Sequence, residues 1–239
     1  GDNTSFRIGG SYYQNKPLIQ TSGFDRISLN SAIDHKASDK LKFGLNLNYS
    51  NIKRATYFGG RASANPVTSS IMISPLRPVY NADGTYNQTD LGEGSPTPGF
   101  NPLSILEEAT QNSLINTIIG SANMDYQFTK NLYFNSLYGM QYQAMKEVQH
   151  VLKGHPVYTV MGPDDSFLSD NRTSIFDWNW SNSLSYRNNF NGRHNLETYL
   201  GMEYQDHVYN LIGARTFKLD DPRPNFGFAT DHLAYNDDQ

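Results

Sequence analysis

Apolar and polar residues alternate with a period of two over several long stretches of the chain. In residues 176–186 every odd position is polar, whereas the even positions are almost all aromatic or aliphatic. These even positions are Phe176, Trp178, Trp180, Asn182, Leu184 and Tyr186. Because successive side chains of a β-strand point to opposite faces, the pattern predicts a strand with one apolar and one polar face.

The same alternation recurs along the chain. The strong stretches are residues 41–49, 118–128, 132–144 and 196–204, and the weaker candidates are residues 4–13 and 24–35. Strands of soluble proteins usually have about 5 or 6 residues, whereas a strand tilted by about 45° needs about 9–11 residues to cross a bilayer. The length of the stretches therefore favours transmembrane strands, and we predict about seven of them.

The charged residues of the five strong stretches all fall on the polar face. An apolar outer face and a polar inner face are typical of a transmembrane β-barrel. The side chains expected to face lipid are Phe43, Leu45, Leu47, Phe134, Tyr138, Phe176, Trp178, Trp180, Leu184, Leu200 and Met202. Those expected to face the lumen are Lys42, Asn46, Asp125, Asn135, Gln141, Asp177, Asn179, Glu197 and Glu203.

Short and long connections alternate between the predicted strands. The short ones are residues 36–40, 129–131 and 187–195, and the long ones are about 51–113 and 147–172. Short periplasmic turns and long extracellular loops are the layout of an outer-membrane barrel. We therefore predict an all-β segment of a large antiparallel transmembrane barrel.

The first long loop carries local signals of its own. Asn101 followed by Pro102 is typical of a helix start, with Asn as the cap and Pro in the first turn. Asp83-Gly84 is a preferred dipeptide for a tight hairpin turn. We predict a short helix and a small hairpin within this loop.

Composition removes several functional classes. The chain has 239 residues, a net charge of −4 and no cysteine. The absence of cysteine excludes disulfides and thiolate metal sites, and the lack of a long basic run argues against nucleic-acid binding. No set of nucleophile, base and orienting group is apparent, so we do not expect an enzyme. We also expect no cofactor and no metal.

Two kinds of polar residue are candidate metal ligands. His150 and His155 have no carboxylate pattern near them that would complete a metal triad, so we interpret them as surface histidines of a loop. The acidic pairs at 164–165 and 220–221 resemble Ca²⁺ ligands, but turns and caps use aspartate more often.

An aromatic loop head follows the stretch at residues 41–49. Tyr57, Phe58 and Arg61 are candidates for contact with a substrate or with a partner that covers the barrel. The aromatic rings would either stack on a sugar or pack against a neighbouring loop, and the sequence leaves both alternatives open.

Several segments, taken in order, resemble one known family. They are TSFRIGGSYYQNKPLI, GFDRISLNSAIDHKASDKLKFGLNLNYS, NPLSILEEATQN and LYFNSLYGMQYQ. The last of these has an aromatic-x-Asn-x-x-x-Gly pattern. In this order the segments are similar to the early barrel strands of SusC/RagA-like TonB-dependent outer-membrane transporters, and the resemblance covers most of the chain.

The resemblance implies a 22-stranded barrel with an N-terminal plug, a TonB box and a SusD-like surface lipoprotein as a lid. It implies TonB-dependent uptake of oligosaccharides or peptides across the bacterial outer membrane. Residues 1–239 show no plug, no TonB box and too few strands for that barrel, so we expect them to be one part of a single barrel domain. The alternatives are a soluble, secreted β-rich carbohydrate-binding module and a passive porin.

Overall fold

The fold was analysed in a computed structural model. It describes residues 3–58, 65–87, 100–153, 155, 166–219, 222–224, 226 and 229–238, with the backbone alone at 229–232 and 236–238. The strands are β1 (Thr4–Asn15), β2 (Gly23–Lys36), β3 (Leu41–Thr56), β4 (Ala109–Gln127), β5 (Leu132–Val151), β6 (Phe167–Phe190), β7 (His194–Leu219) and β8 (Ala229–Asp238). The helices are α1 (Pro66–Met72) and α2 (Pro102–Glu107).

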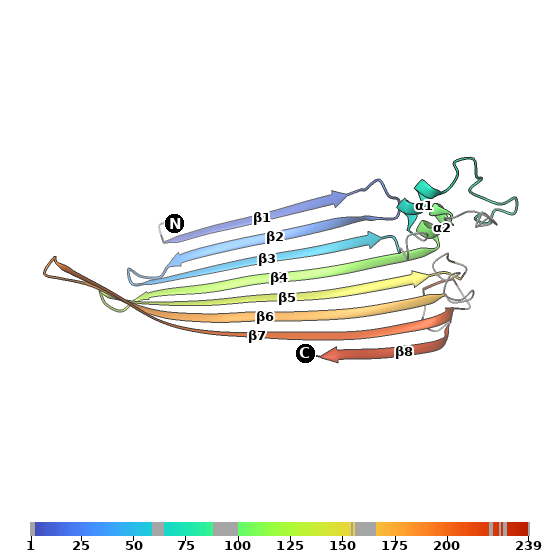
Figure 1. The fold of residues 1–239 in the computed structure, drawn as a ribbon. Helices are drawn as coiled ribbons and strands as arrows, with labels where there is room; N and C mark the ends of the chain where they lie inside the picture. Colours follow the sequence, from blue (N-terminus) through green and yellow to red (C-terminus); the bar gives the residue numbers. More distant parts are fainter. Residues whose placement is uncertain are drawn as a thin grey trace.

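The eight strands form one antiparallel sheet in which each strand pairs with its sequence neighbour, from β1 to β8. Figure 1 shows them side by side in a single curved layer, with both helices at one end. The opposite end carries the short turns. This topology confirms the predicted fold class, a segment of a large antiparallel β-barrel.

The strands are longer than the alternating stretches that predicted them. β3 continues to Thr56 and β4 begins at Ala109, so the predicted connection 51–113 was too long at both ends. The predicted connection 147–172 was also too long, because β5 ends at Val151 and β6 begins at Phe167. At these ends both faces carry polar side chains, so backbone pairing continues after the apolar alternation has stopped.

The end of the chain also differs from the prediction. β7 runs to Leu219, and an eighth strand follows it at Ala229–Asp238. Its partner is β7, in a register that joins Asn210 to Asp238. Residues 229–238 show no clear alternation, so the prediction of about seven strands missed β8.

The short connections have the local chemistry of tight turns. In the β6–β7 turn Asn191 and Gly192 have φ values of 55° and 67°, and Arg193 N–H donates to the Phe190 carbonyl at 3.1 Å. Two consecutive positive φ values define a type I′ turn, whose twist matches that of paired strands. The Asn-Gly dipeptide thus closes this hairpin.

The loop between β3 and β4 is folded. Asn101 caps α2, accepting from the Leu103 N–H at 3.1 Å, and its amide donates to the Val79 carbonyl at 2.7 Å. Tyr80 and Tyr86 form a β-bridge around Gly84, whose φ is 84°. The predicted helix and hairpin are both confirmed, and the Asn101 side chain links them by hydrogen bonds.

A second helix, α1, begins with the same Asn-Pro pair, and the Asn65 side chain accepts from Val67 and Thr68 N–H groups. Among the described residues, neither helix is long and apolar enough to span a membrane.

Candidate functional site: the two faces of the sheet

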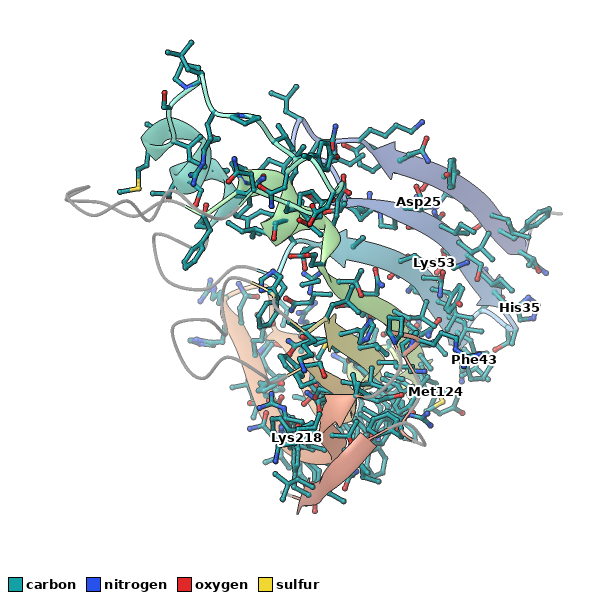
Figure 2. All side chains as sticks on the ribbon, turned by 90° about the vertical axis from the view of Figure 1, so that its right-hand side faces the viewer. Asp25, His35, Phe43, Lys53, Met124 and Lys218 are labelled. Carbon is teal, nitrogen blue, oxygen red and sulfur yellow. The ribbon has the colours of Figure 1, made fainter. Side chains whose placement is uncertain are left out.

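The register divides the side chains of the sheet into two faces. Residues paired across neighbouring strands share a face, so Leu45, Ala122, Tyr138, Trp180 and Tyr204 form one row across β3 to β7. Figure 2 shows another row of the same face, in which His35, Phe43 and Met124 lie in line across β2, β3 and β4. We call this side the apolar face and the other side the polar face.

All eleven side chains expected to face lipid lie on the apolar face, and all nine expected to face the lumen lie on the polar face. The register fixes this placement from β3 to β7. Which face meets lipid and which meets the lumen remains a prediction at this point.

The apolar face is uncovered and rich in aromatic rings. Phe6 is 75% exposed and Leu200 is 71% exposed. Tyr138, Trp178 and Tyr204 form an aromatic row across β5, β6 and β7, with ring centroids 5.9 and 5.0 Å apart. Among the described residues no second layer packs on this row. Apolar side chains on such a scale mark a surface that another apolar medium covers.

From β1 to β7 the apolar stretch shifts along the sheet. On β1 it spans residues 6–12, whose centre aligns through the register with Asn48 of β3. On β7 it spans residues 196–204, whose centre aligns with Leu41. Averaged over the six spacings from β1 to β7, the shift is roughly one residue, about 3.3 Å, for each strand spacing of about 4.8 Å. Strands crossing a level apolar layer would therefore tilt by about 35°, at the lower end of the range for outer-membrane barrels.

The height of the apolar stretch fits a membrane. On β3 it runs from Leu41 to Tyr49, which is about 27 Å along the strand at ~3.3 Å per residue. A tilt of about 35° reduces this to about 22 Å along the barrel axis, near the ~25 Å apolar band of transmembrane barrels. The two faces and the tilt are thus mutually consistent with one transmembrane wall.

The polar face carries hydrogen-bonded side chains in place of an apolar core. Asn135 donates to the Asp125 carboxylate at 2.7 Å, and Arg187 pairs with Glu197 at 2.8 Å. His207 contacts Asp177 at the rim of an open hollow of about 930 Å³ between β4 and β7. Gln141, Asn179 and Glu203 also line this hollow. The surface can therefore donate and accept hydrogen bonds.

Glycines of the polar face lie beneath asparagine side chains. A Cβ on Gly44 would overlap the Asn123 amide, and a Cβ on Gly139 would overlap the Asn179 amide. On the apolar face Gly120 has more room, with the nearest atom of Met140 at 3.4 Å. The side chains of the polar face are therefore crowded over the glycines of neighbouring strands.

The buried side chains of the sheet lie at its loop end, on both faces: His150, Leu168 and Thr216 form one buried row on the apolar side. Ala109, Val151 and Phe167 form a cluster on which Phe58 and Phe217 pack. The ring centroid of Phe167 is 5.6 Å from that of Phe58 and 6.5 Å from that of Phe217. On the polar face the loop end therefore forms a small aromatic cluster.

The two loop histidines are buried, so the prediction that they lie on the surface was wrong. His155 is fully buried: its ring packs edge-on against Phe58, with centroids 6.2 Å apart, and contacts the Ile105 carbonyl at 3.3 Å. Burial lowers the pKa of His155 to about 4. His150 is also buried, at the end of β5. Sequence spacing could not reveal this, because α2 covers the site from a distant part of the chain.

The remaining loop candidates have mixed outcomes. Phe58 packs on the aromatic cluster, which favours the packing alternative over sugar stacking. Tyr57 is partly exposed beside it. Arg61 and the acidic pairs at 164–165 and 220–221 lie outside the described residues. Within the described part of the chain no three potential metal ligands come together.

His207 and Gln205 are residues of the polar face that the sequence reasoning missed. Both line the hollow beside Asp177. The alternation of residues 196–204 continues through them on the polar side, and this signal was available in the sequence. The apolar side of the pattern fails at Asp206, which ended the predicted strand too early.

The chain is similar in sequence to two known receptors. No family model matches the chain. TonB-dependent receptor P26 of Formosa agariphila is 24% identical over 225 residues, which cover 94% of the chain and 22% of that receptor. TonB-dependent receptor P3 of the same organism is 26% identical over 228 residues, which cover 90% and 22%. The chain thus spans about a fifth of these relatives.

Solved structures show the same fold. The RagAB peptide transporter matches 98% of the chain with a TM-score of 0.75 and 14% identity. The RagAB peptide importer in its open-open state matches 100% of the chain with a TM-score of 0.76 and 15% identity. In both cases the chain covers 27% of the solved one.

The fold is that of a segment of a transporter β-barrel. The resemblance to SusC/RagA-like TonB-dependent transporters is confirmed by the two receptors in sequence and by the RagAB structures in fold. The matched proteins are named as receptors and transporters, not as enzymes.

Proposed function

We propose that the chain is part of the wall of an outer-membrane barrel that takes up nutrients in a TonB-dependent manner. The observation that carries this proposal is the single tilted sheet with one uncovered apolar face and one hydrogen-bonded polar face. In this proposal the apolar face meets lipid and the polar face lines the lumen. The similarity to TonB-dependent receptors over most of the chain supports the energy coupling.

The substrate and partners are proposed from the same relatives. Oligosaccharides or peptides are the substrate classes, and a SusD-like surface lipoprotein is the partner at the loop end. The match to a peptide transporter over nearly the whole chain supports the peptide class. Contact with TonB would be made by other parts of the full-length protein.

A soluble β-rich binding module accounts less well for these observations. A soluble protein covers its apolar sheet face with a second layer. Among the described residues, the buried apolar side chains of the sheet are confined to its loop end, whereas Ile8, Leu45 and Leu200 are exposed. A sheet whose apolar face is exposed from β1 to β7 would aggregate in water.

The test is electrophoresis of the full-length protein from its native membrane, with boiled and unboiled samples side by side. A folded barrel is expected to require detergent and to migrate differently before boiling. Uptake of labelled peptides and oligosaccharides is then compared in cells with and without TonB. A protein that stays soluble without detergent and is unmoved by heat would overturn the proposal, and uptake that persists without TonB would favour a passive porin.

A further inference from the structure

A row of cations crosses the apolar face beyond its aromatic edge. Lys53 on β3, Lys146 on β5 and Arg172 on β6 occupy one register row, with Leu114 of β4 between the first two. The row lies toward the loop end. Figure 2 shows Lys53 on this side of the sheet, next to its register partner Asp25.

The position of the row along the strands matches a lipid headgroup layer. Each cation lies four residues beyond the last aromatic residue in the apolar stretch of its strand, which is Tyr49, Tyr142 or Phe176. Four residues rise about 13 Å along a strand, or about 10 Å along the axis at a tilt near 35°. The headgroup region extends roughly 5–8 Å beyond the hydrocarbon core, and long cationic side chains reach back toward it.

Two hollows adjoin along this row and share one cation. A hollow of about 670 Å³ is lined by Lys53 and Lys146. A second hollow, of about 420 Å³, is lined by Lys146 and Arg172 together with Tyr142. Each hollow therefore offers two cations at its rim, and the second also offers an aromatic ring on its membrane side.

The carboxylates nearby leave these cations available. Asp170 contacts both Lys146 and Arg172 at 3.3 Å from one register row farther from the membrane. Its side chain is 19% exposed, whereas those of Lys146 and Arg172 are 45% and 69% exposed. Asp170 thus orients the cations while most of their donors remain free. With Asp25 beside Lys53, three cations face two carboxylates, so the row keeps a positive excess.

We propose that this row binds a glycolipid of the outer leaflet whose sugar headgroup carries two phosphates, the class represented by lipid A. The inference rests on the proposed outer-membrane function. From β3 to β6 the cations span three strand spacings, about 14 Å, with one hollow at each end. A phospholipid carries one phosphate and fills one hollow, whereas a bisphosphorylated disaccharide meets both. Arginine binds phosphate through two N–H groups at once, and lysine through a compact charge.

The test uses the detergent-purified full-length protein and native mass spectrometry. Bound lipid is counted after incubation with bisphosphorylated lipid A, monophosphoryl lipid A or phosphatidylglycerol. The variants are Lys53→Gln, Lys146→Gln, Arg172→Gln and the triple variant. Lys42→Gln is the matched control, because it removes the same charge from the polar face at the turn end of β3. The electrophoretic shift on boiling reports whether each variant folds. If the triple variant does not fold, the comparison is made with the single variants.

We expect the wild type to retain bisphosphorylated lipid A more tightly than the other two lipids. Each neutralised cation of the row should weaken this binding about five-fold, and all three together about 100-fold, whereas Lys42→Gln should leave it unchanged. Equal binding by the triple variant or its folded single variants would overturn the inference. Equal affinity for phosphatidylglycerol or monophosphoryl lipid A, or displacement by inorganic phosphate alone, would overturn its choice of ligand. A wild type with no heat-modifiable barrel would instead overturn the proposed function.

Discussion

A lysine placed at the centre of the apolar stretch of β7 should destabilise the barrel far more than one placed beyond it. Leu200 is the central residue of that stretch and is 71% exposed on the apolar face. Ile212 is on the same strand and the same face and is 64% exposed. We compare Leu200→Lys with Ile212→Lys, and with Glu203→Lys on the polar face.

The expected magnitudes follow from depth. Leu200 lies near the mid-plane, where a lysine facing lipid costs about 2–4 kcal/mol. Ile212 lies twelve residues farther along β7. That is about 40 Å along the strand and about 32 Å along the axis at the tilt near 35°. This distance is beyond the headgroups, so the cost of Ile212→Lys should be close to zero. Glu203→Lys faces water and should likewise cost little.

The assay is equilibrium refolding of the full-length protein into lipid vesicles over a denaturant series. Leu200→Lys should lower the free energy of unfolding by about 2–4 kcal/mol, which is a factor of about 30 to 1,000 in the folding equilibrium. Equal losses for Leu200→Lys and Glu203→Lys would refute the assignment of the two faces. Equal losses for Leu200→Lys and Ile212→Lys would refute the assigned depth.

Three further outcomes test other features. Gly44→Ala forces the Asn123 amide to move, so the same refolding assay should find it about 1 kcal/mol less stable than Gly120→Ala. The Asn182 amide nitrogen finds no hydrogen-bond partner among the described residues although it is buried on the apolar face, so Asn182→Leu should raise stability by about 1 kcal/mol or more; a loss would show that the amide is satisfied in lipid. In the folded loop the pKa of His155 is lowered to about 4, whereas in the opened loop it returns to about 6.5, so the opened loop binds a proton at a higher pH. The free energy that keeps the loop end folded should therefore fall by up to about 3 kcal/mol as pH falls from about 6.5 toward 4. Amide exchange there, corrected for intrinsic rate, should be faster at pH 5 than at pH 7 in the wild type, and a His155→Phe variant that shows the same difference would contradict this.

The middle of each strand was predictable because one face of the sheet is apolar and the other is polar. In residues 132–144 one face carries Phe134 and Tyr138 while the other carries Asn135 and Gln141, so period-two alternation is imposed on the sequence itself. The register then follows, because a slip by one residue would exchange the two faces. The short connection predicted at residues 187–195 contains the tight turn at Asn191-Gly192, whose backbone conformation needs these residue types. The strands run closer to it than predicted, because β6 ends at Phe190 and β7 begins at His194.

The ends of the strands were not predictable for the same reason. Lys146 and Arg172 lie on the apolar face, yet they are polar like their neighbours on the other face, so the alternation disappears beyond the apolar stretch. Backbone hydrogen bonds still hold these residues in the sheet, but every residue type except proline can form such bonds, so they do not appear as a pattern in the sequence.

The loop end required contacts that no local pattern contains. His155 is buried because Phe58 and the Ile105 carbonyl approach it from segments far apart in the sequence. The alternation that defines the wall therefore also explains which part of the molecule resists sequence reasoning. Beyond the apolar stretch the two faces no longer differ in residue type, the loops pack on one another like the core of a soluble protein, and only the three-dimensional structure shows which side chains meet.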